Sequence, residues 1–240
     1  MFQIAHTYIA SQALDTEDPH IIVGAIIPDA SISGWRTYIS AVLNPQPTDT
    51  SGITFQDMHP VLRARSLARH INKNVALGVL THSAVDVISH GGDDISRDKY
   101  DWRNPKAFSF GGERSWWARR FPKLEPKNYS RGMMMHNFAE VMLDCYVAQT
   151  HPEAATLLEN SIKHVDAARI GADLATALGK NSEVIIAKVN AYLASTSGFV
   201  RMIRRAPRVN KDSLDEVLGN CIQTCESQAP EWYKLIKTSA

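Results

Sequence analysis

The sequence predicts an all-α fold, built as one multi-helix domain over residues 1–240, and three observations carry this prediction. Apolar residues recur at helical spacing along most of the chain, whereas alternating, strand-like runs are few. No composition shift, repeat or low-complexity tract marks a domain boundary. With 44% hydrophobic and 21% charged residues, the chain has the apolar mass for one continuous core.

Helical periodicity is clearest in six stretches of the chain. They cover residues 5–15, 60–90, 132–149, 152–178, 182–205 and 212–224. Pro60, Pro152 and Asp212 mark three of the helix starts, because proline is favoured in the first turn and Asp is a good N-cap. The last three stretches predict a helical C-terminal part over residues 152–240.

Residues 30–58 and 91–131 interrupt this pattern with clustered Pro and Gly, and they predict two long loops. The second is rich in Trp and Phe, which argues against disorder. It fits either a wall or lid over a substrate cleft, in which aromatics stack and arginines meet phosphate, or a small satellite core that anchors the loop. The residues assigned to substrate binding on the first interpretation are Trp102, Phe108, Arg114, Trp116 and Trp117.

Charge and cysteine content limit the partners and the compartment. The 26 Lys and Arg against 25 Asp and Glu give a net charge of +1, so we expect no stable nucleic-acid complex. Three cysteines cannot build a disulfide framework, and the N-terminal stretch lacks the plan of a signal peptide, so we expect a cytoplasmic protein. No apolar run is long enough to span a membrane, which leaves peripheral membrane contact open.

The segment GVLTHSAVDVISH, residues 78–90, places three residues of metal-ligand type at successive four-residue intervals: His82, Asp86 and His90. On a helix each such step turns only about 40°, so all three share one face. His and Asp suit zinc, and a carboxylate can serve ions on both sides of it. The alternative is a surface hydrogen bond between one His and one Asp.

A second pair follows in HNFAEVMLD, residues 136–144, where His136 and Glu140 are one turn apart and Asp144 continues the face. This pair alone is as well explained by an ordinary helix surface. Two such helices in one chain favour a metal site.

Three more ligand-type residues lie at boundaries of the predicted elements: His6, Asp29 and His59. Asp29 ends the apolar run GAIIPDA, and His59 directly precedes Pro60. Taken singly, Asp29 would be a turn or cap carboxylate and His59 a flanking residue. Together with the two helices they complete an ordered set.

This ordered set, His6, GAIIPD with Asp29, His59, GVLTHSAVDVISH and HNFAEVMLD, resembles the zinc-dependent phospholipase C family. Fungal single-strand nucleases and glycosylphosphatidylinositol-specific phospholipase D are relatives of that family. The resemblance covers about residues 1–145 and implies an all-α fold with zinc ions in a cleft.

What the resemblance implies for the ligands is a division into three zinc sites. One zinc would bind Asp29, His59, His82 and Asp86; a second would share Asp86 with His6 and the terminal groups of Met1; a third would bind His90, His136 and Glu140. The family commonly begins with a Trp exposed by signal-peptide removal, whereas this chain begins with Met1. We therefore expect two or three zinc ions, or another divalent transition metal in the same sites.

The expected function is hydrolysis of a phosphodiester, in a lipid head group or a related small molecule, by metal-activated water that Asp29 orients or deprotonates. Three alternatives stay open: a single-strand nuclease or nucleotidase, a metalloenzyme of the same fold with non-phosphate chemistry, and a non-catalytic module whose metals brace the fold at a membrane surface. The oligomeric state is not predicted.

Overall fold

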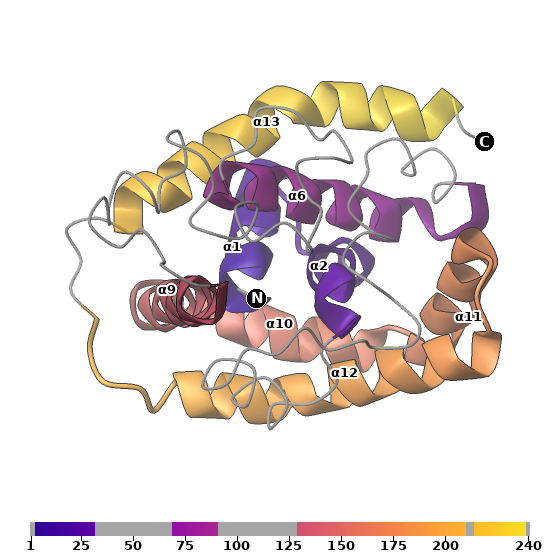
Figure 1. Ribbon diagram of the computed structural model, residues 1–240. Helices are drawn as coiled ribbons and strands as arrows, with labels where there is room; N and C mark the ends of the chain where they lie inside the picture. The colour runs from indigo at the N-terminus through magenta and orange to yellow at the C-terminus, as the bar shows by residue number, and fades with distance from the viewer. Residues whose placement is uncertain (1–2, 32–68, 91–128, 210–213, 239–240) are drawn as a thin grey trace.

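The computed structural model describes residues 3–31, 69–90, 129–209 and 214–238, with residues 31, 87–90 and 129–139 described as backbone only. These ranges contain eight α-helices, one 3-10 helix and no strand, which confirms the all-α prediction for the described part of the chain (Figure 1). The elements are α1 (Gln3–Ala13), α2 (Pro19–Ile26), η1 (Ile27–Ser31), α6 (Lys73–His90), α9 (Tyr129–Thr150), α10 (Pro152–His164), α11 (Ala167–Leu178), α12 (Ser182–Ile203) and α13 (Leu214–Thr238).

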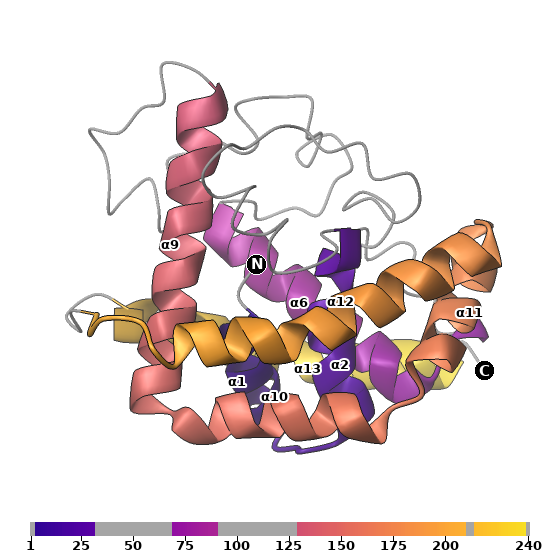
Figure 2. The ribbon, with the colours of Figure 1, turned by 90° about the horizontal axis from the view of Figure 1, so that it is seen from below.

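Helices α1 and α2 lie at the centre of this arrangement. Figure 1 shows α6 and α13 on one side of them and α10 and α12 on the other, with α9 and α11 at the two ends. In Figure 2, α9 crosses α12 and passes α1. The two N-terminal helices are therefore enclosed by helices from the rest of the chain.

Helix α2 is absent from the helices that the periodicity predicts. Asp18 is its N-cap: the carboxylate accepts hydrogen bonds from the backbone N–H groups of His20 at 2.8 Å and Ile21 at 3.3 Å. Pro19 occupies the first turn, where its missing N–H costs nothing. Every residue from Ile21 to Ile26 is buried, so the helix has no polar face and shows no helical period.

Two predicted helices are each interrupted in the structure. The stretch 60–90 breaks at residues 71–72, where the side chain of Asn72 accepts from the N–H of Asn74 and α6 begins at Lys73. The stretch 152–178 divides into α10 and α11, because Val165 is extended and Asp166 caps the next helix through the N–H of Arg169. Both breaks are made by short polar side chains that satisfy free backbone donors.

Other predicted boundaries also move. Helix α13 continues to Thr238, well past residue 224, with Pro230 inside it. The predicted loops 30–58 and 91–131 lie mainly outside the described residues, although η1 covers residue 30 and α9 already begins at Tyr129. None of the described helices is long and apolar enough to cross a membrane.

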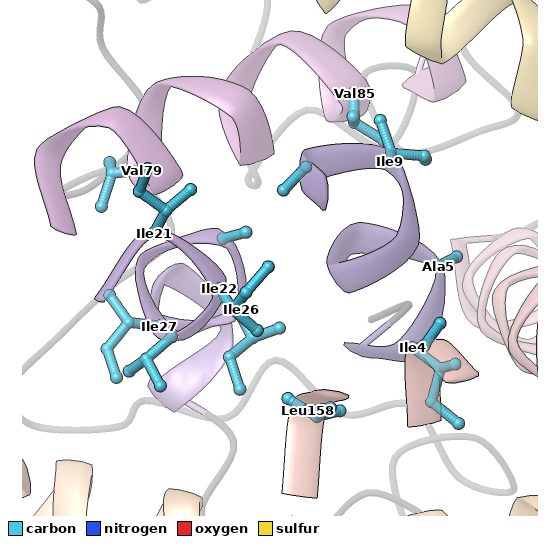
Figure 3. Packing of buried hydrophobic residues seen from close by; sticks show 14 of the residues in the cluster. Ile4, Ala5, Ile9, Ile21, Ile22, Ile26, Ile27, Val79, Val85 and Leu158 are labelled. Atoms are coloured by element: carbon cyan, nitrogen blue, oxygen red, sulfur yellow. The ribbon is translucent and has the colours of Figure 1, made fainter. Parts of the chain in front are cut away.

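The core joins α1, α2 and α6 most closely. Figure 3 shows Val79 of α6 above Ile21 of α2, and Val85 above Ile9 of α1; all four are buried. Two glycines make the approach of α2 and α6 possible. A Cβ on Gly24 would lie 2.3 Å from the carbonyl oxygen of Val75, and one on Gly78 would lie 2.1 Å from that of Ile21. This contact sets the position of α6 relative to η1, which follows α2 directly.

Candidate metal centre

Four ligand-type side chains meet in the interior between α1, η1 and α6. His6 comes from α1, Asp29 from η1, and His82 and Asp86 from successive turns of α6. Both histidines are fully buried and neither aspartate is more than 6% exposed. Ionisable groups are rarely buried in such a group unless they pair with one another or bind an ion.

The two oxygens of Asp86 face different histidines. Oδ1 lies 3.4 Å from Nε2 of His6, and Oδ2 lies 3.4 Å from Nε2 of His82. Asp29 comes from η1, and its Oδ1 lies 4.0 Å from the same Nε2 of His82. Asp86 therefore lies between the two histidines, with one oxygen toward each, and its role as a bridge between two metal ions stays a prediction.

One ligand atom from each of His6, Asp29 and His82 lies within 4.8 Å of the other two. Zinc binds nitrogen and oxygen ligands at about 2.0–2.2 Å in tetrahedral geometry, so two ligands of one zinc ion lie about 3.3–3.6 Å apart. The 4.0 Å between Oδ1 of Asp29 and Nε2 of His82 is wider than this, so binding of an ion would draw the side chains together. These three residues could hold a single metal ion.

His82 is oriented by a backbone contact on the side of its ring away from the cluster. Its Nδ1 lies 2.8 Å from the carbonyl oxygen of Ala25, and because a carbonyl only accepts hydrogen bonds, Nδ1 carries the proton. In the neutral ring, Nε2 then presents its lone pair to Asp29 and Asp86. This is the outer contact that metal-binding histidines usually make. It depends on the Gly24–Gly78 crossing, since Ala25 follows Gly24 on α2.

Burial and mutual charge set the protonation of the two histidines in opposite ways. Burial and the neighbouring His82 lower the pKa of His6 to about 3, so its ring is neutral at neutral pH. Burial also acts to lower the pKa of His82, but the negative charges of Asp86 and Asp29 outweigh it, and the pKa ends above its usual value. In the metal-free protein the cluster therefore keeps its proton on His82.

The pKa of the Asp29 carboxyl also departs from its usual value. Burial raises its pKa, and the negative charges of Asp86 and Glu140 add to this effect. Glu140 is itself 2% exposed and extends from α9 into the same interior. Of the residues predicted for the third zinc site, Glu140 is thus buried near the cluster.

The remaining predicted site residues are not described in side-chain detail. His90 ends α6 and His136 lies within α9, both as backbone only. Met1, His59 and the aromatic-loop residues Trp102, Phe108, Arg114, Trp116 and Trp117 lie outside the described residues. The division of ligands among three zinc sites stays a prediction, whereas His6, Asp29, His82 and Asp86 do lie close together.

Asp144 has a role that its place on the helix face did not reveal. Its Oδ1 accepts hydrogen bonds from the backbone N–H groups of Ile4 and Ala5, each at 2.9 Å, and the side chain is fully buried. It thus caps the first turn of α1 from α9, although 140 residues separate it from Ile4. Burial raises the pKa of Asp144 well above its usual value, while the hydrogen bonds from Ala5 and Ile4 act against this.

Tyr192 is a neighbour of the cluster that sequence reasoning missed. It is buried on α12, which packs against both η1 and α9. Burial raises the pKa of its hydroxyl well above the usual value, and the negative charges of Asp29 and Asp144 contribute. A buried tyrosine at helical spacing reads as an ordinary core residue, and no signal in the sequence distinguishes it.

No family model, curated protein or solved structure matches this chain. The interpretation of the cluster therefore depends on its own chemistry. Two imidazoles and two carboxylates are the donors that zinc and related divalent transition metals take, and no cysteine sulfur belongs to the group within the described residues.

Proposed function

We propose that this chain is a metal-dependent hydrolase, with zinc as the first candidate ion and a phosphodiester as the substrate class. The observation that carries the proposal is the convergence of His6, Asp29 and His82 at ligand spacing in the interior, with Asp86 against both histidines. The choice of a phosphodiester, in a lipid head group or a small molecule, is supported by the ordered motifs that resemble the zinc-dependent phospholipase C family.

In this proposal His6, Asp29 and His82 hold the metal, and Asp86 lies against both histidines. Ala25 keeps the His82 ring in the tautomer that presents Nε2, and Asp86 orients both rings by facing one with each oxygen. A bound zinc ion supplies Lewis acidity, which lowers the pKa of a bound water toward neutrality and stabilises negative charge on phosphate oxygen. The low-dielectric surroundings of the cluster strengthen these interactions.

Asp29 is the candidate to orient or deprotonate the water. Burial raises the pKa of its carboxyl, so it retains a proton more readily than an exposed Asp does. Asp29 lies in η1, the 3-10 helix that directly follows the buried helix α2. We assign two roles to this carboxyl: it contributes to the metal site and it accepts the proton of the water.

The absence of cysteine from the described cluster favours a catalytic over a purely bracing site. Structural zinc sites are closed by four protein ligands, frequently cysteine, whereas catalytic sites combine His and carboxylate with an open position. Cys145, Cys221 and Cys225 are buried as free thiols, and burial raises the pKa of each. A metal-braced, non-catalytic module remains the alternative outcome of the activity test.

The test compares native protein and His82→Ala, each dialysed against chelator and then reloaded with zinc. The substrates are bis(p-nitrophenyl) phosphate, phosphatidylcholine vesicles, single-stranded DNA and p-nitrophenyl acetate. We expect zinc-dependent cleavage of one or more of the phosphodiesters by the native protein, and its loss in His82→Ala. Zinc binding without cleavage of any substrate would favour the bracing role, and cleavage of the acetate ester alone would favour non-phosphate chemistry.

A further inference from the structure

We propose that Asp144 is a positioning residue of the metal centre: it fixes His6 by capping helix α1 from helix α9. This inference rests on the proposed metal-binding function of the His6, Asp29 and His82 cluster. It assigns to Asp144 no contact with the metal or substrate, and its effect passes through the first turn of α1.

The contacts of Asp144 go to the backbone directly before His6. Its Oδ1 accepts from the N–H groups of Ile4 and Ala5, the second and third residues of α1, each at 2.9 Å. His6 is the next residue along the helix. Ile4, Ala5 and His6 are all fully buried, so water does not satisfy these donors in place of the carboxylate.

The first turn of any helix leaves backbone N–H groups without partners inside the helix, and a side-chain acceptor usually supplies the cap. Here the acceptor for two of them is brought by a helix from a distant part of the sequence. Without it the first turn of α1 has buried, unsatisfied donors and frays. His6 lies at the end of that turn, so its ring would lose its fixed place 3.4 Å from Asp86.

The location of Asp144 links α9 to the cluster. It lies one turn beyond Glu140, another buried residue of α9, and α9 packs against α1. A shift of α9 would therefore move the cap of α1 and, through it, His6. Removal of a hydrogen-bond partner of a metal ligand commonly weakens metal affinity about 10–100-fold, and we expect an effect of this size from loss of the cap before His6.

Two conservative variants separate capping from charge. Asp144→Asn keeps the shape of the side chain and a carbonyl oxygen that accepts from both N–H groups, but it removes the negative charge. Asp144→Glu keeps the charge but moves the oxygens by one methylene. If Asp144 acts by capping, Asp144→Asn retains zinc affinity and Asp144→Glu loses it; if it acts as a ligand or as a charge, the order is reversed.

The experiment measures zinc affinity by competition with a chromogenic chelator, on the full chain and well below its unfolding temperature. We expect Asp144→Asn to bind zinc nearly as tightly as native protein and Asp144→Glu to bind about 10–100-fold more weakly. In a His6→Ala background the difference between the two variants should disappear, because the effect passes through His6.

Asp166→Ala is the matched control. It removes the cap of α11, in which the Asp166 carboxylate accepts from the N–H of Arg169 at 2.9 Å, and it should leave zinc affinity unchanged.

The outcomes distinguish this inference from the proposed function. Native protein that binds no zinc would overturn both. Native protein that binds zinc, together with equal affinities in both Asp144 variants, would overturn the positioning role alone. Weak zinc binding by Asp144→Asn with native binding by Asp144→Glu would also overturn it, as would an effect of Asp144→Glu that persists in the His6→Ala background.

Discussion

The imidazole rings of His6 and His82 are stacked, with centroids 4.0 Å apart and planes inclined by 22°. Each ring directs its Nε2 toward a different oxygen of Asp86. Two buried imidazolium ions at this separation would repel each other strongly, so the pair holds at most one proton in the metal-free protein. A divalent ion held by His6, Asp29 and His82 would take the place of that proton and would supply positive charge to the buried carboxylates.

Asp86→Asn should weaken zinc binding more than any other single change in the cluster that preserves side-chain volume. The amide has one oxygen for two histidines, and it lacks the negative charge that balances the ion. We expect zinc affinity to fall by at least about tenfold and zinc-dependent activity to fall with it.

The control for Asp86→Asn is Asp173→Asn on α11, which removes one carboxylate charge from an ion pair with Arg169, 2.9 Å away, on the protein surface. Equilibrium dialysis with zinc measures both variants. Equal zinc occupancy in the two would show that Asp86 does not contribute to the site.

Zinc affinity should rise with pH in the range where His82 loses its proton. The pKa of His82 is raised, so below that pKa a proton must leave the ring before the metal binds. The affinity then increases by about tenfold for each pH unit and levels off above the folded-state pKa of His82. Calorimetry in buffers of different ionisation enthalpy measures the protons released, and a pH-independent affinity with no proton release would contradict this protonation pattern.

The metal-free protein should lose stability through His6 as the pH falls. Its folded-state pKa is about 3 against 6.5 for the unfolded chain, so the unfolded state takes up the proton first. The contribution is fully present above pH 6.5 and is lost progressively as the pH falls toward 3. Between pH 7 and pH 5 this amounts to roughly 2 kcal/mol of unfolding free energy.

Urea unfolding of chelated native protein and of His6→Gln checks this value. Gln does not titrate, so native protein should lose more stability than the variant between pH 7 and pH 5. A parallel decrease in the two proteins would mean that His6 is not the titrating group.

Gly78→Ala should destabilise the protein and disturb the centre, because its Cβ would lie 2.1 Å from the carbonyl oxygen of Ile21 and 2.5 Å from the amide nitrogen of Ala25. The overlap is with backbone, so α2 and α6 must separate, and Ala25 then moves away from His82. We expect a loss of about 3 kcal/mol in unfolding free energy, with weaker zinc binding.

Gly219→Ala on α13 is the matched control, since an added Cβ there meets no atom of the described residues within 4 Å. Ala is the better helix former, so this change should stabilise the protein by about 0.5–1 kcal/mol and leave zinc binding unchanged. Urea unfolding and zinc titration measure both variants. A Gly78→Ala variant as stable as native protein would show that the crossing tolerates a wider separation.

The sequence indicated the local parts of the site better than the long-range ones. The spacing of His82 and Asp86 requires only a helix, and the two do share a face. Helix α2 could not be predicted from periodicity, because its eight residues form an almost uniformly apolar run that fits a strand as well. The role of Asp144 could not be predicted either, since a contact with the backbone of Ile4 depends on the packing of α9 against α1 and leaves no spacing pattern.

The most direct test of the central claim is the metal content of the purified full chain, loaded with zinc and freed of excess, measured by elemental analysis beside a His6→Ala, His82→Ala double variant. The cluster predicts at least one equivalent of tightly bound zinc in native protein, little in the double variant, and a higher unfolding temperature for native protein with zinc than with chelator. At a zinc concentration 100 times the dissociation constant, the stabilisation should be about 2.7 kcal/mol. Native protein that retains no zinc, or a double variant that retains as much as native protein, would contradict the claim that His6, Asp29 and His82 form a metal centre.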